Sequence, residues 1–169
     1  MDAIQAVMTR RSIRSYKQDD VPGDMVQKLL QAAMNAPSAG NQQPWHLIVI
    51  RERRILDAIP AFHPYSKMLK QAVLGIVVCG DLSLEVYNGF WVQDCSAATQ
   101  NILIAAHGLG LGAVWLGIHP LEERIAGMKK LLSFPDHIVP LSMVSIGWPA
   151  EKKAPAIRYK QERVHYDKW

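Results

Sequence analysis

Three arginines and a serine lie within five residues near the start of the chain, in the run Arg10-Arg11-Ser12-Ile13-Arg14. Guanidinium groups match phosphate oxygens with paired hydrogen bonds, and a serine hydroxyl or a backbone N–H adds a further donor. In an extended segment the side chains alternate, so Arg10, Ser12 and Arg14 would share one face. The run therefore suits phosphate binding, although a solvated basic surface explains it as well.

An uncharged polar loop occupies residues 36–45, with the sequence APSAGNQQPW. The side-chain amides of Asn41, Gln42 and Gln43 each donate and accept hydrogen bonds. Such groups suit the edge of a flat heteroaromatic ligand that carries mixed donors and acceptors. A turn whose amides cap the neighbouring backbone is the other explanation.

A glycine-rich stretch, residues 108–117, ends in Leu116 and Gly117. It follows a predicted helix and precedes a predicted strand, which is the reverse of the order in a dinucleotide-binding fingerprint. The stretch could let a ligand approach the backbone at Leu116 and Gly117. A helix stop followed by a core strand also accounts for these glycines.

Side chains for acid–base or nucleophilic chemistry are scarce. The six histidines show no metal-ligand spacing, and the sequence contains no GxSxG motif and no obvious catalytic pair of carboxylates. Asp94 falls within a predicted helix, where we expect it to make a hydrogen bond. We therefore expect no metal and no catalytic side chain, and a bound cofactor that carries the reaction.

The basic residues are concentrated at the two ends of this 169-residue chain, whose net charge is +4. Residues 10–17 and 152–168 together hold over half of the 19 lysines and arginines. If the two ends meet in space, they form one anion site. Because both clusters lack interleaved aromatic residues and any nucleic-acid motif, we favour a small phosphate ligand and expect no nucleic-acid partner.

The composition, 49% hydrophobic and 20% charged, favours one compact domain over residues 1–169. No apolar run approaches the roughly 18 residues that span a bilayer, and the first residues show no signal-peptide pattern. We expect a soluble cytoplasmic protein without a membrane partner. Cys79 and Cys95 lie among apolar or small residues, which predicts buried free thiols.

Hydrophobic periodicity predicts an α+β or α/β domain with a mixed sheet of four or five strands. The helix predicted at residues 90–108 is rich in small residues and suits the domain centre or a subunit interface. Residues 150–169 are polar and proline-punctuated, and we expect them to form an arm. The other predicted helices are 2–9, 22–35, 53–59 and 121–132, and the predicted strands are 46–50, 73–81, 113–118 and a run within 137–149.

Taken in order, these motifs resemble the FMN-dependent nitroreductase family in its short form. The resemblance covers nearly the whole chain and departs at Val73, where many relatives have proline before the strand. The segments that carry it are RRSIR (10–14), APSAGNQQPW (36–45), AVLGIVVCGD (72–81), the run from Trp91 to Ile118, and ERVHYDKW (162–169).

The resemblance implies an α+β fold around a mostly antiparallel sheet, and an intertwined homodimer in which the C-terminal arm packs on the partner subunit. FMN would lie at the dimer interface. The implied phosphate and pyrimidine-edge contacts are Arg10, Arg11, Ser12 and Arg14, with Arg163 as a second phosphate contact. The implied contacts along the flavin ring and the ribityl chain come from the other subunit and are Pro37, Ser38, Asn41 and Gln43. The resemblance also implies backbone donors at Leu116 and Gly117 near N5 and O4, and it places Lys67 and Met68 beside the flavin.

The implied activity is hydride transfer from NAD(P)H through flavin N5 to an electron-poor acceptor, such as a nitroaromatic or a quinone, by a ping-pong scheme. Two alternatives stay open. Enzymes of similar fold carry out dehalogenation, dehydrogenation or flavin fragmentation, and a non-enzymatic FMN-binding redox sensor would share the same cofactor site.

Overall fold

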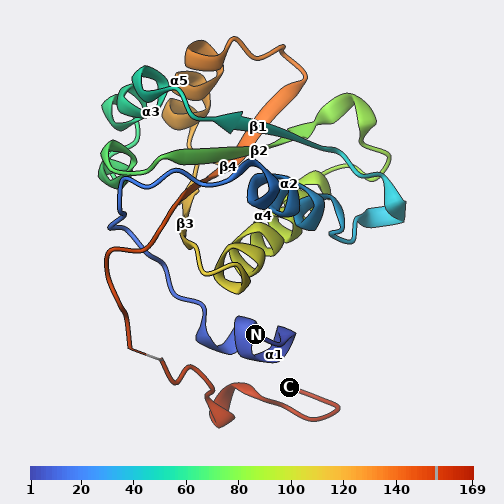
Figure 1. Ribbon diagram of the computed structural model, residues 1–169. Coiled ribbons are helices and arrows are strands. Elements are labelled where there is room, and N and C mark those ends of the chain that lie inside the picture. Colours follow the sequence, from blue (N-terminus) through green and yellow to red (C-terminus); the bar gives the residue numbers. More distant parts are fainter. Residues whose placement is uncertain (155) are drawn as a thin grey trace.

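Four strands form one antiparallel sheet with helices on both faces (Figure 1). In the computed structural model, which describes residues 1–154 and 156–169, the strands follow the order β1-β2-β4-β3. They are β1 (Trp45–Ile50), β2 (Leu74–Asp81), β3 (Gly112–Gly117) and β4 (Ile138–Gly147). Every pairing between them is antiparallel. This confirms the α+β class and the mostly antiparallel sheet that the resemblance implied, and it corrects the mixed sheet expected from hydrophobic periodicity, which does not report strand direction.

Strand β2 lies inside the sheet, and all of its residues are buried. Ile76 and Val78 belong to the hydrophobic cluster on one face of the sheet, whereas Val77 and Cys79 belong to the cluster on the other face. This alternation is what a strand between two helical layers requires, because successive side chains point to opposite faces. The apolar run at residues 73–81 therefore predicted a central strand correctly.

Helices α2 (Gly23–Met34) and α4 (Trp91–Gly108) cover one face of the sheet, and α3 (Arg53–Ala58) and α5 (Glu122–Leu132) cover the other (Figure 1). Helix α4 packs against α2 and contacts all four strands. Its small residues Ala98 and Ala106 are fully buried there. The helix thus takes the central position, one of the two that its composition predicted.

The end of α4 depends on a glycine. Gly110 has a φ of +79°, a left-handed conformation that glycine adopts without a steric penalty. The N–H of Leu111 then donates to the carbonyl of Ala106 at 2.8 Å, which satisfies an otherwise free acceptor in the last turn. This confirms the predicted helix stop.

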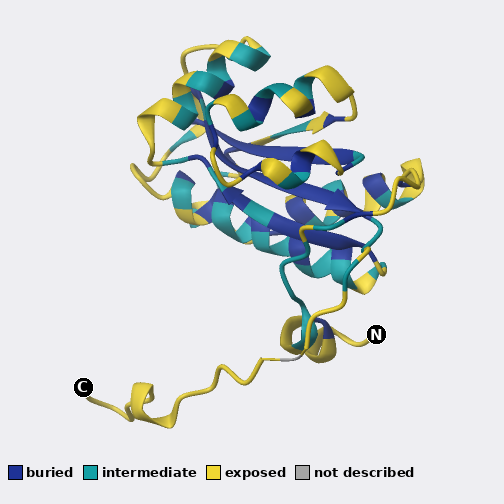
Figure 2. Cartoon of the chain, turned by 90° about the vertical axis from the view of Figure 1, so that its left-hand side faces the viewer, coloured by how far each residue is buried: buried dark blue, intermediate teal, exposed yellow. Residues whose placement is uncertain are grey.

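Both ends of the chain depart from the body of the molecule, as Figure 2 shows. Helix α1 (Ala3–Thr9) exposes Ile4, Val7 and Met8, and its start is capped by the Asp2 side chain, which accepts from the Gln5 N–H at 2.8 Å. Beyond residue 151, every described residue of the arm is exposed. Among the helices of the described residues, none has the length and apolar character that a bilayer crossing requires.

The two cysteines confirm their prediction. Cys79 and Cys95 are free and buried, on β2 and α4. Burial raises the pKa of each thiol to about 12. Both therefore stay protonated near neutral pH and act as small apolar core residues.

Candidate active site

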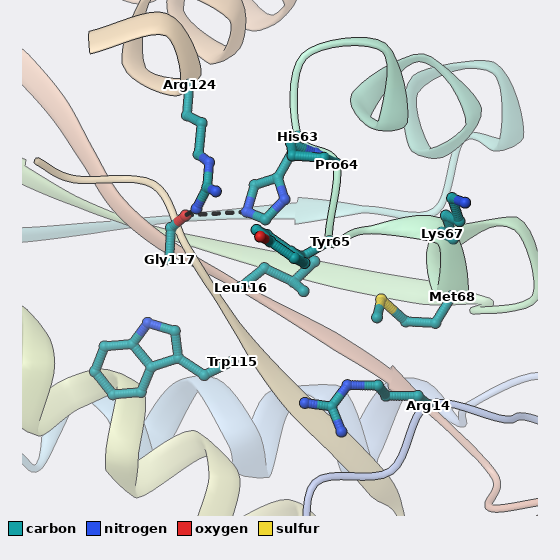
Figure 3. A pocket seen from close by; sticks show the side chains of 10 residues that line it. All are labelled: Arg14, His63, Pro64, Tyr65, Lys67, Met68, Trp115, Leu116, Gly117 and Arg124. Atoms are coloured by element: carbon teal, nitrogen blue, oxygen red, sulfur yellow. Dashed lines mark hydrogen bonds between the residues drawn. The ribbon is translucent and has the colours of Figure 1, made fainter. Parts of the chain in front are cut away.

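An open cavity of about 390 Å³ lies beside the end of β3, where the sheet has a free edge (Figure 3). Three cations face it and no carboxylate lines it among the residues that the structure describes. Apolar and aromatic side chains form most of the remaining wall. The lining residues are Arg14, His63, Pro64, Tyr65, Lys67, Met68, Trp115, Leu116, Gly117 and Arg124.

The backbone of Gly117 is the fixed point of this cavity. Its carbonyl accepts from His63 Nε2 at 2.9 Å and from Arg124 Nη1 at 2.8 Å. In an extended strand, the N–H and the carbonyl of one residue point to the same side. The Gly117 N–H therefore lies at the free edge of β3, where it can meet a bound molecule.

His63 is held neutral at this edge. Its side chain is 2% exposed, and burial, helped by the nearby Arg124 charge, lowers its pKa. A neutral imidazole that donates through Nε2 carries a lone pair on Nδ1, and that atom is buried with no partner among the described residues. The His63 carbonyl accepts from the Ser66 hydroxyl at 2.7 Å, so the turn that carries the imidazole is itself fixed.

Arg124 and Tyr65 form the opposite wall of the same corner. The guanidinium carbon of Arg124 lies 5.6 Å from the centre of the Tyr65 ring, a cation–π arrangement. Sequence reasoning missed His63, Tyr65 and Arg124. The first two belong to an irregular stretch without a motif, and Arg124 belongs to a helix whose charge pattern is that of an exposed surface.

The arginine-rich run leads along the edge of β3 into the cavity. Ser12 pairs with Ala113 in a parallel bridge, and the Ile13 N–H donates to the Ala113 carbonyl at 3.0 Å. Two residues further on, Arg14 reaches the cavity with its side chain (Figure 3). Its backbone N–H donates to the Glu151 carboxylate at 2.5 Å, which fixes the segment.

The two basic ends of the chain meet beside this run. Lys153 donates to the Ser12 carbonyl at 2.7 Å, and Arg11 donates to the carbonyl of Ala154 at 3.1 Å. Burial and the neighbouring charges of Arg158 and Arg11 lower the pKa of Arg10. A half-buried arginine among other cations favours the binding of an anion, which the distribution of charge in the sequence also predicted.

The amide-rich loop lies elsewhere. In Figure 1, η1 (Ala39–Asn41) stands at the right-hand end of the molecule, and the turn η3 (Lys67–Lys70) that borders the cavity stands at the left-hand end. Pro37 and Ser38 line a separate cavity of about 340 Å³ with the first turns of α4. Asn41 and Gln43 are exposed and do not line the cavity beside β3, so within one chain this loop does not reach that cavity.

Comparison with known proteins identifies the fold. The family described as "Nitroreductase family" matches residues 7–77 and 61–148. A Methanothermobacter thermautotrophicus protein, provisionally named NADH dehydrogenase/NAD(P)H nitroreductase, is 51% identical over 169 residues, which are 100% of this chain and 88% of that protein. The chain belongs to the nitroreductase family.

Two solved structures agree with that assignment. A Parabacteroides distasonis protein with the same provisional name shares 38% identity at a TM-score of 0.95, covering 99% of this nitroreductase and 98% of that chain. A provisionally named nitroreductase from Desulfovibrio desulfuricans, solved in complex with FMN, shares 31% identity at a TM-score of 0.85, covering 100% of this chain and 98% of its own.

The predicted site residues of this nitroreductase thus fall into separate groups. One group lines the cavity and one leads into it, whereas the loop residues and Arg163 lie apart from both. Arg163 belongs to η5 (Gln161–Arg163) in the exposed arm. The cavity group is Arg14, Lys67, Met68, Leu116 and Gly117; the adjacent group is Arg10, Arg11 and Ser12; the distant loop group is Pro37, Ser38, Asn41 and Gln43.

Proposed function

We propose that this nitroreductase binds FMN and uses NAD(P)H to reduce electron-poor acceptors, such as nitroaromatics or quinones. The observation that carries the proposal is the cavity beside Gly117, which combines cations, apolar walls and a free strand edge. The FMN complex of the similar Desulfovibrio protein and the name of the Methanothermobacter relative support the same cofactor and the same electron donor.

The residues present fit a phosphorylated flavin. Arg14 and Lys67 place positive charge in the cavity, and Met68 and Leu116 give it an apolar wall. Arg10, Arg11 and Ser12 would hold the phosphate, with the Gly117 N–H as a donor to the ring edge. When bound, FMN supplies the ring that takes up and passes on a hydride.

Within the cavity, the side chains have separate roles. Arg14 would place a positive charge where it offsets negative charge on one edge of a bound ring. Leu116 and Met68 would exclude water from the ring. His63 and Arg124 fix the Gly117 carbonyl and, through it, the direction of the Gly117 N–H. No side chain in this scheme acts as a nucleophile.

The site is completed by a second copy of the chain in this proposal. The loop that carries Pro37, Ser38, Asn41 and Gln43 stands at the opposite end of the molecule from its own cavity (Figure 1), so it would reach the partner's cavity. Arg163 on the exposed arm would do the same at the partner's phosphate position. Exposed apolar residues on α1 and on the arm, among them Met8 and Trp169, support a homodimer in which these segments are covered.

The experiment is to purify the protein, release and quantify the pigment, and measure NADH and NADPH oxidation with a nitroaromatic and with a quinone. We expect FMN, and parallel double-reciprocal plots typical of ping-pong kinetics. Protein that takes up no FMN would contradict the proposal. Tight FMN binding without turnover would indicate a redox sensor, and product analysis under air and argon would reveal a different flavin reaction.

A further inference from the structure

Arg124 carries a positive charge that no carboxylate of the described chain compensates. The ion pairs formed by residues 1–154 and 156–169 do not include it. It also lies in the first turn of α5, where the helix dipole disfavours a cation. The neighbouring acids Glu122 and Glu123 are exposed and do not pair with it. The Arg124 charge is therefore available to an anion from outside the chain.

The guanidinium of Arg124 is held in place rather than free to move. Nη1 donates to the Gly117 carbonyl at 2.8 Å, and the guanidinium carbon lies 5.6 Å from the centre of the Tyr65 ring. An arginine has five N–H donors in a rigid fork, so this single hydrogen bond leaves most of them available. The fork is therefore prepared to bind a carboxylate or a phosphate.

Arg124 is separate from the cations that suit the cofactor. Figure 3 shows Arg124 and Arg14 on either side of Leu116 and Gly117, with Lys67 at a third position. Arg14 continues the run that begins at Arg10, so we assign its charge to the phosphate and the ring edge of FMN. Arg124 comes from another element and faces the corner closed by Tyr65.

We propose that Arg124 binds the anionic group of the substrate that enters this cavity beside the cofactor, and so makes the enzyme prefer anionic over neutral substrates. The inference rests on the proposed function. Tyr65, which is 73% exposed at the mouth of the cavity, would present its ring to an aromatic substrate. The anion is a carboxylate on the acceptor or a phosphate of the dinucleotide, and the two sources can be separated.

The test uses holoenzyme with Arg124→Gln, which keeps an N–H donor for the Gly117 carbonyl and removes the charge. Arg124→Lys keeps the charge and removes the fork. Lys130→Gln is the matched control, because Lys130 is exposed on the same helix. FMN content and the flavin spectrum are measured first for every variant.

Two kinetic arms identify the anion. The acceptor arm compares kcat/KM for 4-nitrobenzoate and its neutral analogue 4-nitrobenzamide. The donor arm compares NADH and NADPH with 1-benzyl-1,4-dihydronicotinamide, which has no phosphate. A third measurement without turnover titrates benzoate and benzamide into the oxidised holoenzyme and follows the flavin absorbance.

We expect Arg124→Gln to lower the anionic-to-neutral ratio by at least about tenfold in one arm, the scale of one charge-assisted hydrogen bond. The anionic-to-neutral ratio of Arg124→Lys should lie between those of Arg124→Gln and the wild type, and the ratio of Lys130→Gln should equal that of the wild type. Loss in the acceptor arm, with weaker benzoate binding, assigns the carboxylate; loss in the donor arm assigns the dinucleotide phosphate.

An unchanged ratio in both arms, or loss of FMN from Arg124→Gln, would overturn the inference while leaving the proposed function standing. A wild-type protein without FMN would overturn the proposed function, and this inference with it.

Discussion

The side-chain amide of Gln42 donates to the buried carboxylate of Asp94 across 2.7 Å, which ties the amide-rich loop to the first turn of α4. The other carboxylate oxygen accepts from the Ala39 N–H at 2.9 Å. The side-chain oxygen of Gln42, Oε1, in turn accepts from the backbone N–H groups of Val86 and Tyr87 at 2.8 and 3.1 Å. The nitrogen and the oxygen of the Gln42 side chain are thus both hydrogen-bonded within the chain, whereas Asn41 and Gln43 stay exposed.

Removal of the Asp94 carboxylate should loosen this loop. In Asp94→Ala, the Ala39 N–H and the Gln42 amide lose their acceptor in a part-buried site, which we expect to cost about 2–4 kcal/mol in the free energy of unfolding. FMN retention should fall as well, because the loop carries Ser38. Chemical denaturation and FMN content measure both effects. Asp19→Ala, an exposed carboxylate, is the control, and equal behaviour of the two variants would contradict this role.

Gly40 is required by the same loop. Its φ is +52°, and a Cβ at this position would lie 2.2 Å from Tyr87 Cε2. We expect Gly40→Ala to destabilise the protein by about 1–3 kcal/mol. Gly23→Ala places a Cβ in open space at the start of α2 and should be neutral or slightly stabilising. Thermal denaturation of the two variants provides the comparison, and similar melting temperatures would count against the strained loop.

The sequence predicted the regular elements well, because apolar periodicity depends on local spacing and burial. The ends of β2 and α4 fall within one residue of their predicted positions. The contacts of the site were harder to predict, because they join residues that are far apart in the sequence. The partners Gln42 and Asp94 are 52 residues apart, and His63 meets Gly117 across 54. An amide or an imidazole in a sequence does not reveal which of its atoms the fold already uses.

The burial of His63 should make stability depend on pH. Its pKa in the folded state is lowered from the ordinary value of about 6.5, so below that pH the unfolded chain binds a proton that the folded chain does not. The His63 contribution to stability is therefore fully present above about pH 6.5 and is lost as the pH falls toward the folded pKa. His63→Gln, which cannot titrate there, should lose less stability between about pH 7.5 and 5.5.

Urea denaturation at the two pH values measures this difference. His107 also has a lowered pKa and contributes in the same direction, but it is present in both proteins, so their difference isolates His63. A steeper pH dependence in His63→Gln than in the wild type would show that the imidazole is protonated in the folded protein.

Arg10 should matter for FMN and not for folding. Its charge is half-buried beside Arg11 and Arg158, which favours a bound phosphate. We expect Arg10→Ala to weaken FMN binding about tenfold or more, the scale of one charge-assisted contact. Lys130→Ala, on an exposed face of α5, should retain FMN as the wild type does. Fluorescence titration of apoprotein with FMN gives both constants, and equal constants would remove Arg10 from the phosphate site.

The central claim is that each FMN lies between the cavity of one copy and the loop of another. The most direct test is the FMN content of a heterodimer that pairs an Arg14→Ala subunit with a Ser38→Ala/Gln43→Ala subunit. The two subunits are co-expressed with different tags so that the heterodimer can be purified. Each variant alone is expected to be deficient in FMN. In the heterodimer, one site combines an intact cavity with an intact loop, so the account predicts about one FMN per dimer. If cavity and loop of the same copy formed the site, both sites would be damaged, and a heterodimer as deficient as the parent variants would contradict the account.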